Sequence, residues 1–187
     1  MIESGFLRDV QTNPINRALL ERLPLLGLCD AWLVAGCLFQ TIWNLKAGTE
    51  VTFGIKDYNI FYFNDSDISW DAENKEIIRL SELCRDLGVT IELKNQARVH
   101  IWYAERFGRG YPQLRSAQDG IDRFLIGCTR VGLGVSVENR QALYAPSGLD
   151  DLYAGVLRPN PLNDRPDLFA AKAESYQQRW SWLRIEI

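Results

Sequence analysis

The sequence has little of several residues and patterns that would point to a particular class of protein. It has one histidine, His100, among 187 residues, and its four cysteines form no CxxC pair. A single histidine excludes a histidine-rich metal centre, and widely separated cysteines argue against a zinc site or a disulfide framework. We therefore expect Cys29, Cys37, Cys84 and Cys128 to be buried thiols.

Long apolar runs and export signals are also missing. No stretch approaches the roughly 20 apolar residues that a membrane-spanning helix needs. The start, Met1-Ile2-Glu3-Ser4, lacks the basic and apolar segments of a signal peptide. The sequence contains no P-loop, Rossmann glycine fingerprint, GxSxG elbow or HExxH motif. We therefore expect a cytoplasmic protein that does not contact a membrane.

Basic residues do not predominate. Lys and Arg number 21 against 24 Asp and Glu, which gives a formal net charge of −3. This balance argues against a long nucleic acid as a partner, although a local basic patch stays open. The 47% hydrophobic and 24% charged content is typical of a globular chain. We expect one domain over residues 1–187, with a core at about 13–95 and a C-terminal extension at about 96–187.

The first half of the chain predicts alternating helices and strands. Each helix has a start or stop residue, and each strand is rich in β-branched or aromatic residues. The predicted elements are a helix from Asn13-Pro14 to Pro24, a buried strand at Ala31–Ala35, a helix ending at Gly48, a strand at Tyr58–Phe63, a helix from its cap Ser69 to Gly88, and a strand at Val89–Leu93.

The second half is less regular. The segment Ile101–Phe107 is open between helix and irregular structure. The other predicted elements are a helix capped by Ser116 with Asp119, two strands at Thr129–Val137 and Gln141–Ala145 around a turn at Glu138-Asn139-Arg140, a short helix capped by Ser147 that carries Leu149 to Val156, and a last helix from about Pro166 to Leu183. An aromatic stripe on the last helix, Phe169 to Trp180, indicates core packing. Together these elements predict an α+β fold.

The segment Asp57-Tyr58-Asn59 is the main candidate for chemistry. Side chains alternate along a strand, so Asp57 and Asn59 project from the same face of the sheet. Oxygen ligands at this spacing can hold Mg²⁺ against a triphosphate, and Glu92 on a later strand can complete such a site. Gly36 precedes a helix, where a phosphate could approach the backbone.

Each of these residues also has a plain structural interpretation. Glu92 is equally compatible with the solvated face of its strand. The polar cluster after it could contact a nucleotide or form a solvated strand end; its members are Lys94, Asn95, Gln96, Arg98 and His100. As a lone histidine, His100 fits a structural role better than that of a general base. Asp150-Asp151 fits a helix start better than a metal pair, because adjacent helical residues do not face each other.

Five stretches of the sequence are similar to one known group. They are Ala35-Gly36-Cys37 through Trp43-Asn44, Ile55 to Phe63, Lys94 to Tyr103, Ala145 to Leu152, and Arg158-Pro159-Asn160-Pro161. With these stretches the chain resembles a bacterial nucleotidyltransferase-like family related to the DNA polymerase β superfamily. The resemblance implies a polymerase-β-like core, a small mixed sheet with packed helices, followed by a C-terminal extension of a hairpin and helices.

The sequence departs from the superfamily pattern at two positions. Cys37 stands where a second small residue is usual, and Asn59 stands where the pattern has a second carboxylate. An amide oxygen can coordinate Mg²⁺ but brings no negative charge, so metal affinity should fall. Either this protein binds one metal ion weakly, or it keeps the fold without catalysis.

The resemblance implies the transfer of a nucleotidyl group from a nucleoside triphosphate to an unknown acceptor hydroxyl, with Mg²⁺ or Mn²⁺. Asp57 would be the principal metal ligand, Asn59 a weak neutral ligand, and Glu92 the second acid. Gly36, Cys37 and Gln40 would border the triphosphate, and Lys94 and Arg98 would contact the nucleotide. The alternatives are a catalytically impaired nucleotide-binding or regulatory module, and a structural or partner-binding protein. The sequence leaves the acceptor, the nucleotide and the oligomeric state open.

Overall fold

A five-stranded mixed sheet forms the centre of the structure, which is a computed structural model and describes residues 2–136 and 140–187. The strand order is β3-β2-β1-β4-β5, with β2 and β3 parallel and the other neighbours antiparallel. The strands are β1 (Trp32–Val34), β2 (Tyr58–Tyr62), β3 (Ile91–Asn95), β4 (Gly132–Val135) and β5 (Gln141–Tyr144), and a second, two-stranded sheet pairs β6 (Val156–Leu157) with β7 (Arg184–Ile185). This arrangement confirms the predicted α+β fold.

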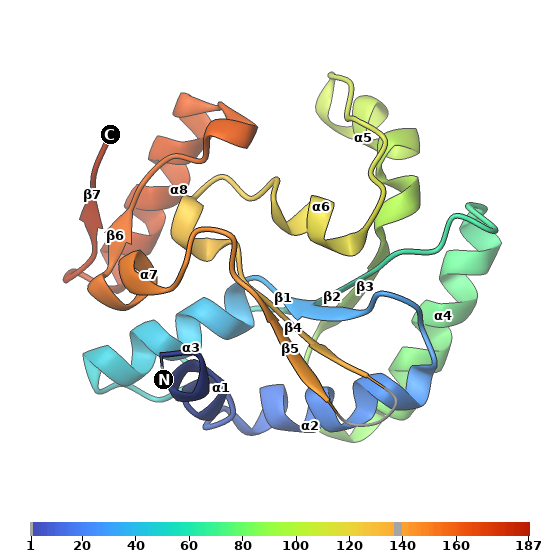
Figure 1. Ribbon diagram of the computed structural model, residues 1–187, viewed down its shortest axis with the longest axis horizontal. Helices are drawn as coiled ribbons and strands as arrows, with labels where there is room; N and C mark the ends of the chain where they lie inside the picture. The colour runs from blue at the N-terminus through green and yellow to red at the C-terminus, as the bar shows by residue number, and fades with distance from the viewer. Residues whose placement is uncertain (1, 137–139) are drawn as a thin grey trace.

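Helices lie on both sides of the large sheet. In Figure 1, α2 and α4 lie below it, and α5, α6 and α8 lie above it. The helices are α1 (Ile2–Val10), α2 (Pro14–Arg22), α3 (Gly36–Ala47), α4 (Trp70–Leu83), α5 (Val99–Phe107), α6 (Ala117–Ile121), α7 (Asp150–Ala154) and α8 (Pro166–Arg179). Short 3₁₀ turns occupy Leu23–Leu26, Arg85–Leu87, Gln96–Arg98, Gly127–Thr129 and Pro161–Asn163.

Local sequence signals set most of these helix boundaries. The Asn13 side chain accepts hydrogen bonds from the first turn of α2, and the Ser69 hydroxyl accepts one from the amide of Ala72. Gly48 and Gly88 follow helical segments with φ of 66° and 64°, a left-handed conformation that costs glycine little. These predictions are confirmed because capping and helix termination depend on neighbouring residues alone.

The two faces of strand β2 have different environments. Tyr58, Ile60 and Tyr62 are buried in the hydrophobic core, whereas Asn59 and Phe61 on the other face keep partial exposure. This is the alternation expected for a strand with one packed face. It leaves the face that carries Asn59 available for a site.

The aromatic stripe on α8 packs against α3. Trp180 and Tyr176 contact Trp43 with ring centroids 5.4 Å and 5.2 Å apart, and the Trp180 indole donates to Asn44 Oδ1 at 2.8 Å. All four residues are buried. The prediction of a packing role for this stripe is confirmed, and the contact fixes α8 against α3.

Three predicted boundaries or caps differ in the structure. The last helix ends at Arg179, and the segment that follows pairs β7 with β6. Ser147 does not cap α7, because its hydroxyl accepts hydrogen bonds from Arg130. Val156 belongs to β6 and not to a helix, since Gly155 ends α7 with φ of 69°. Each of these differences involves a partner distant in sequence.

Two other expectations changed in part. Cys29 is exposed, while Cys37, Cys84 and Cys128 are buried as predicted. Of the predicted turn at Glu138-Asn139-Arg140, residues 138 and 139 lie outside the described residues.

The predicted core at about 13–95 does not contain the whole sheet, because β4 and β5 come from the later segment and β4 pairs with β1. None of the described helices is long and apolar enough to span a membrane.

Candidate functional site

A cavity of about 570 Å³ lies between the Asn59 face of the sheet and the surrounding helices. The residues that line it come from segments far apart in sequence. From the sheet and its approach they are Lys56, Asp57, Asn59, Phe61 and Lys94; from the helices and their junctions they include Ala35, Gly36, Gln40, Gln96, Trp102, Tyr103, Tyr111, Arg123, Phe124, Thr129, Lys172, Tyr176 and Arg179.

The start of α3 forms one wall of this cavity. Val34 pairs with Asn59 across β1 and β2, so the residues after Val34 begin the helix beside the candidate pair. Gly36 leaves the backbone of this first turn open, and a Cβ at this position would lie 2.5 Å from Gln40 Nε2, so the end of that flexible side chain would have to shift. The first amides of a helix and its macrodipole favour an anion. The structure therefore places a helix N-terminus, which favours anions, next to Asp57 and Asn59.

Ala35, immediately before α3, has a strained backbone. Its φ of 66° and ψ of −141° are close to a region that only glycine occupies without penalty. Strain of this kind costs of order 1–3 kcal/mol and occurs often at functional sites. It directs the chain from β1 straight into α3 at the edge of the cavity.

Replacing Ala35 by glycine is expected to raise the free energy of unfolding by about 1 kcal/mol. Relief of strain should exceed the cost of about 0.5–1 kcal/mol that glycine's freedom in the unfolded chain imposes. Urea denaturation measures the change. The matched control is Ala171→Gly in the exposed face of α8, which should lower stability by about 0.5–1 kcal/mol. Equal losses in both variants would contradict the assignment of strain to Ala35.

Asp57 and Asn59 are brought together as the sequence predicted. Asn59 Nδ2 donates to Asp57 Oδ1 at 2.8 Å, and both side chains line the cavity. The amide therefore stabilises the Asp57 carboxylate as an uncharged donor. A carboxylate at position 59 would instead repel it.

Glu92 lies on the neighbouring strand but is engaged elsewhere. It is in register with Asn59 across β2 and β3, yet its carboxylate accepts from Lys94 Nζ at 2.8 Å. It lines a second cavity of about 770 Å³ at the outer edge of β3, and it is not among the described residues that line the first. In residues 2–136 and 140–187, no group of three or more His, Cys, Asp or Glu side chains could hold a metal ion.

The donor set at Asp57 fits one Mg²⁺ ion that arrives with a nucleotide. Mg²⁺ is commonly held by one or two protein oxygens together with substrate phosphates and waters. Asp57 supplies a carboxylate, and Asn59 supplies an amide oxygen if its side chain turns. A second ion does not fit these residues as they stand, because the third predicted ligand, Glu92, is paired with Lys94.

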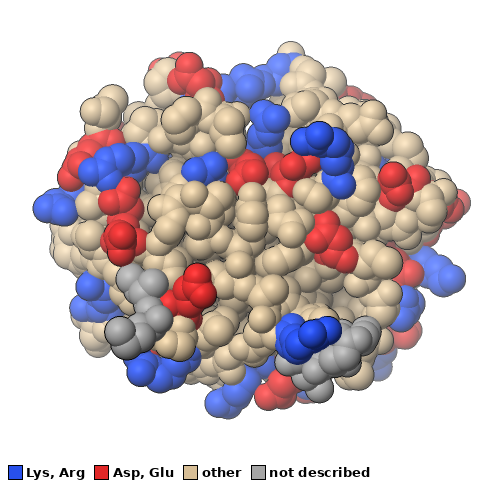
Figure 2. All heavy atoms as spheres, viewed as in Figure 1, with Lys and Arg blue, Asp and Glu red and all other residues tan. Residues whose placement is uncertain are grey.

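Positive charge dominates the lining of the first cavity. Among the described lining residues Asp57 is the one acidic side chain, and the cationic ones are Lys56, Lys94, Arg123, Lys172 and Arg179. Elsewhere the charges are mixed, and basic and acidic side chains are interspersed on the face that Figure 2 shows. The cavity is therefore a local concentration of positive charge on a protein whose net charge is −3.

Two of these cations lie on α8. Arg179 donates to the Gly54 carbonyl at 3.2 Å and lies over the rings of Tyr176 and Trp180. Burial lowers the pKa of the Arg179 guanidinium and that of the Lys172 ammonium, and the nearby Asp57 carboxylate partly opposes the shift at Lys172. Both cations thus line the cavity, Arg179 partly buried and Lys172 exposed to solvent, so attraction to an anion is strengthened more at Arg179.

Aromatic rings also line the cavity. Tyr103 and Tyr111 stack with ring centroids 4.3 Å apart and 37° between their planes, and Phe61 meets Phe124 edge to face at 5.9 Å. Aromatic side chains of this kind can stack on a planar base. The cavity therefore combines a cationic side with an aromatic side.

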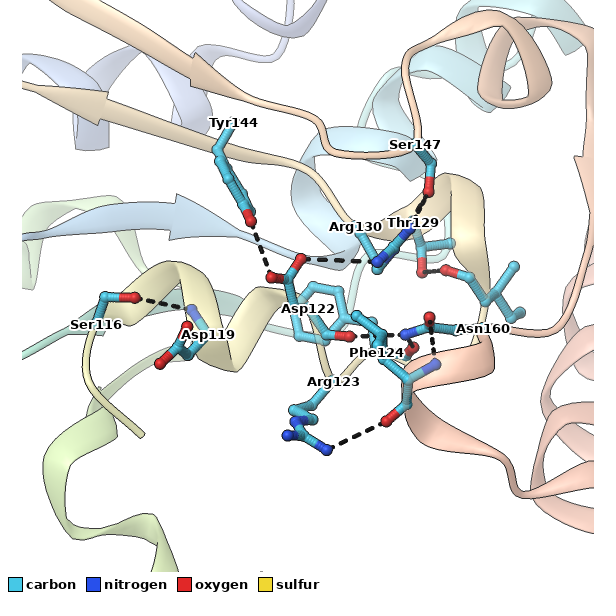
Figure 3. Close-up of polar contacts among 12 residues, drawn as sticks. Ser116, Asp119, Asp122, Arg123, Phe124, Thr129, Arg130, Tyr144, Ser147 and Asn160 are labelled. Carbon is cyan, nitrogen blue, oxygen red and sulfur yellow. Dashed lines mark hydrogen bonds and ion pairs between the residues drawn. The ribbon is translucent and has the colours of Figure 1, made fainter. Parts of the chain in front are cut away.

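Two asparagine side chains, the buried Asn160 and the partly exposed Asn163, hold the segment that carries Arg123 and Phe124. Asn160 Nδ2 donates to the carbonyls of Asp122 and Phe124 at 2.7 Å and 2.6 Å, as Figure 3 shows. Asn163 Nδ2 donates to the Arg123 carbonyl at 2.5 Å. These bonds fix the wall of the cavity, which gives the sequence stretch Arg158-Pro159-Asn160-Pro161 a local structural role.

Three other predicted site residues are not in the first cavity. Cys37 is fully buried, and its thiol donates to the Val34 carbonyl at 3.3 Å. Burial raises the pKa of this thiol. Arg98 forms a buried ion pair with Glu73 and, with Glu92, lines the second cavity. Thus the structure brings together Gly36, Gln40, Asp57, Asn59 and Lys94, and it separates Cys37, Arg98 and Glu92 from them.

Sequence reasoning missed the cations that come from the later part of the chain. Lys172 and Arg179 are seven residues apart and therefore lie on one face of α8. That spacing was visible in the sequence, but nothing local indicates that this face meets Asp57. Arg123 lies in an irregular segment without any periodic signal.

Together, a mixed sheet with helices on both sides and a cationic cavity beside the start of α3 define a protein with the polymerase-β-like nucleotidyltransferase fold. The chain belongs to a nucleotidyltransferase family, whose model it matches over residues 21–185. None of the curated proteins shows significant similarity to it.

Solved structures agree with this fold. An NMR structure described as revealing a CCA-adding enzyme head domain is 27% identical, with a TM-score of 0.76 over 97% of this chain and 94% of that one. An apo form of a tRNA-processing enzyme is 14% identical with a TM-score of 0.56. That match covers 91% of this chain and 43% of the enzyme's chain. The second similarity concerns the fold alone.

Proposed function

We propose that this protein binds a nucleoside triphosphate in the first cavity and transfers its nucleotidyl group to an acceptor hydroxyl. One observation carries the proposal: five cationic side chains and one carboxylate surround a cavity that also has an aromatic wall. The triphosphate would lie toward Lys172, Arg179 and the start of α3. The base would lie toward Tyr103 and Tyr111.

In this transfer the acceptor oxygen forms a bond to the α-phosphorus. The bond between that phosphorus and the oxygen bridging to the β-phosphate breaks, and pyrophosphate leaves with the electron pair. The acceptor proton passes to a carboxylate, and Asp57 is the one described among the cavity lining. A Mg²⁺ ion held by Asp57 and Asn59 would neutralise phosphate charge when bound. Lys172 and Arg179 would stabilise the charge that develops on pyrophosphate.

A second candidate function is nucleotide binding without transfer. It is favoured by the amide at Asn59, which donates to Asp57 where the superfamily pattern has a second carboxylate. The two candidates share the cavity and differ in chemistry. Release of pyrophosphate from a bound nucleoside triphosphate separates them.

Calorimetric titration with each of the four common nucleoside triphosphates, in millimolar Mg²⁺, tests the binding step. We expect at least one to bind with a stoichiometry near one. Absence of binding by all four at high micromolar concentrations would overturn both candidates. Pyrophosphate release would then be followed with the nucleotide that binds, and its absence with every acceptor tried would favour the binding module.

Replacing Arg179 by methionine is expected to weaken nucleotide binding by roughly 10- to 150-fold. A charge-assisted hydrogen bond contributes about 1.5–3 kcal/mol, which corresponds to that range. Calorimetry measures the dissociation constant, and thermal unfolding reports whether the variant is folded. Arg184→Met, an exposed position in β7 outside the cavity lining, is the matched control and should leave binding unchanged. Equal affinity of Arg179→Met and the parent would exclude Arg179 from the site.

A further inference from the structure

Nucleotidyl transfer commonly uses two metal ions, and carboxylates hold those ions in place. The described lining of the first cavity has too few carboxylates to hold two. Two-ion sites hold their metals with several carboxylates and use them to neutralise the attacking and leaving oxygens. Here Asp57 is the one acidic side chain described in the lining, Asn59 is neutral, and Glu92 is paired with Lys94. The residues fit one ion. If a nucleotide binds as proposed, the remaining positive charge has to come from the protein.

Most of the cations around the cavity already have a partner. Lys94 pairs with Glu92, Arg123 donates to the Leu162 carbonyl at 3.2 Å, and Arg179 donates to the Gly54 carbonyl. These contacts fix the side chains and satisfy part of their hydrogen-bonding capacity. They leave fewer N–H donors of these side chains free for a phosphate, and at Lys94 the Glu92 carboxylate also offsets the charge.

Lys172 differs from these three cations. Among the described residues it has no hydrogen bond and no carboxylate within ion-pair distance, and its ammonium lies 5.8 Å from the centre of the Tyr176 ring. It lines the same cavity as Asp57, near enough for the carboxylate to act on its charge. Lys56 also lines the cavity, and the side chains of both lysines are exposed to solvent. Lys56 adjoins Asp57 in sequence, whereas Lys172 comes from α8 and lies over the Tyr176 ring.

The backbone position of Lys172 is set by the packing of α8. Tyr176, one turn further along α8, is buried against Trp43 and Phe39 of α3. This packing sets α8 against the same helix whose first turn borders the cavity. Lys172 therefore reaches the cavity from α8, whereas Asp57 reaches it from the approach to β2.

We propose that the Lys172 ammonium supplies the positive charge that a second metal ion supplies in a two-ion site. Nucleotide binding by this protein then needs at most one divalent ion, and a substantial part of it persists without any. This inference rests on the proposed function and adds the group that compensates for Asn59. It concerns a side chain that would contact the phosphates directly.

The experiment compares nucleotide affinity in millimolar Mg²⁺ with affinity in excess EDTA, using the nucleoside triphosphate found to bind the parent protein. For the parent we expect a difference of about tenfold or less. For Lys172→Met we expect binding in EDTA to be lost, or at least about thirtyfold weaker, and to recover in part when Mg²⁺ is added. Lys172→Arg keeps the charge and should retain binding in EDTA.

Lys75→Met, on the exposed face of α4, is the matched control and should behave as the parent does. Thermal unfolding of each variant separates loss of binding from loss of fold. A parent protein that binds nucleotide in Mg²⁺ and not in EDTA would overturn the inference and leave the proposed function intact. Equal weakening of Lys172→Met in both conditions would also overturn it, because Lys172 would then be an ordinary phosphate contact. If no nucleotide binds in either condition, the proposed function fails and this inference fails with it.

Discussion

Replacing Arg98 by methionine is expected to lower the free energy of unfolding by about 3–5 kcal/mol. The guanidinium forms an ion pair with Glu73, and the two side chains are 10% and 6% exposed. Arg98 Nε also donates to the Ile68 carbonyl at 3.2 Å, and the guanidinium lies over the Trp70 ring. Removing one partner of such a pair leaves a buried charge without compensation, and that loss sets the expected magnitude.

Urea denaturation measures this change, with Arg85→Met as the control. Arg85 is exposed, and its replacement should alter stability by less than about 0.5 kcal/mol. The double variant Glu73→Leu with Arg98→Met should recover part of the loss, because it removes the unpaired carboxylate. If Arg98→Met instead weakens nucleotide binding and leaves stability near that of the parent, the nucleotide contact that the sequence predicted for Arg98 would be supported.

Replacing Asn59 by aspartate is expected to make the stability of the protein depend on Mg²⁺. Without metal, the hydrogen bond from Asn59 to Asp57 is lost and two carboxylates face each other, so stability should fall by about 1–3 kcal/mol. The repulsion should also raise the pKa of one carboxylate in the pair. With metal, the second carboxylate adds charge to the site, and Mg²⁺ binding should restore the lost stability by mass action.

Thermal unfolding with and without millimolar Mg²⁺ measures this effect. The matched control is the exchange variant Asp57→Asn with Asn59→Asp, which keeps one carboxylate and one amide. It should show little more response to Mg²⁺ than the parent. An equal response of the parent and Asn59→Asp would place the metal-binding groups elsewhere. Transfer activity that appears only in Asn59→Asp would identify the parent as a binding module.

Much of the fold could be predicted because its signals are local. The cap at Ser69, the turn glycines Gly48 and Gly88, and the alternation along Tyr58–Phe63 all act through neighbouring residues, and the structure has each of them. Predictions were wrong where a distant partner decided the outcome. The Ser147 hydroxyl accepts hydrogen bonds from Arg130 instead of capping a helix. The chain after the last helix forms β7, which pairs with β6.

The candidate site shows the same division. Strand alternation was enough to place Asp57 and Asn59 on one face, and the glycine before α3 was enough to place a helix start nearby. Alternation also puts Glu92 and Lys94 on one face of β3, so their ion pair has a local signal that sequence reasoning missed. The register of Glu92 with Asn59, in contrast, depends on the pairing of β2 with β3.

The sequence by itself determined the local elements, the Asp57 and Asn59 pair, and the absence of a second carboxylate at position 59. The tertiary structure alone decided which charges meet that pair. Lys172 and Arg179 are more than 100 residues from Asp57, and they reach the cavity because the aromatic residues of α8 pack on α3. Electrostatic attraction depends on distance in space, and hydrophobic packing between remote segments sets that distance.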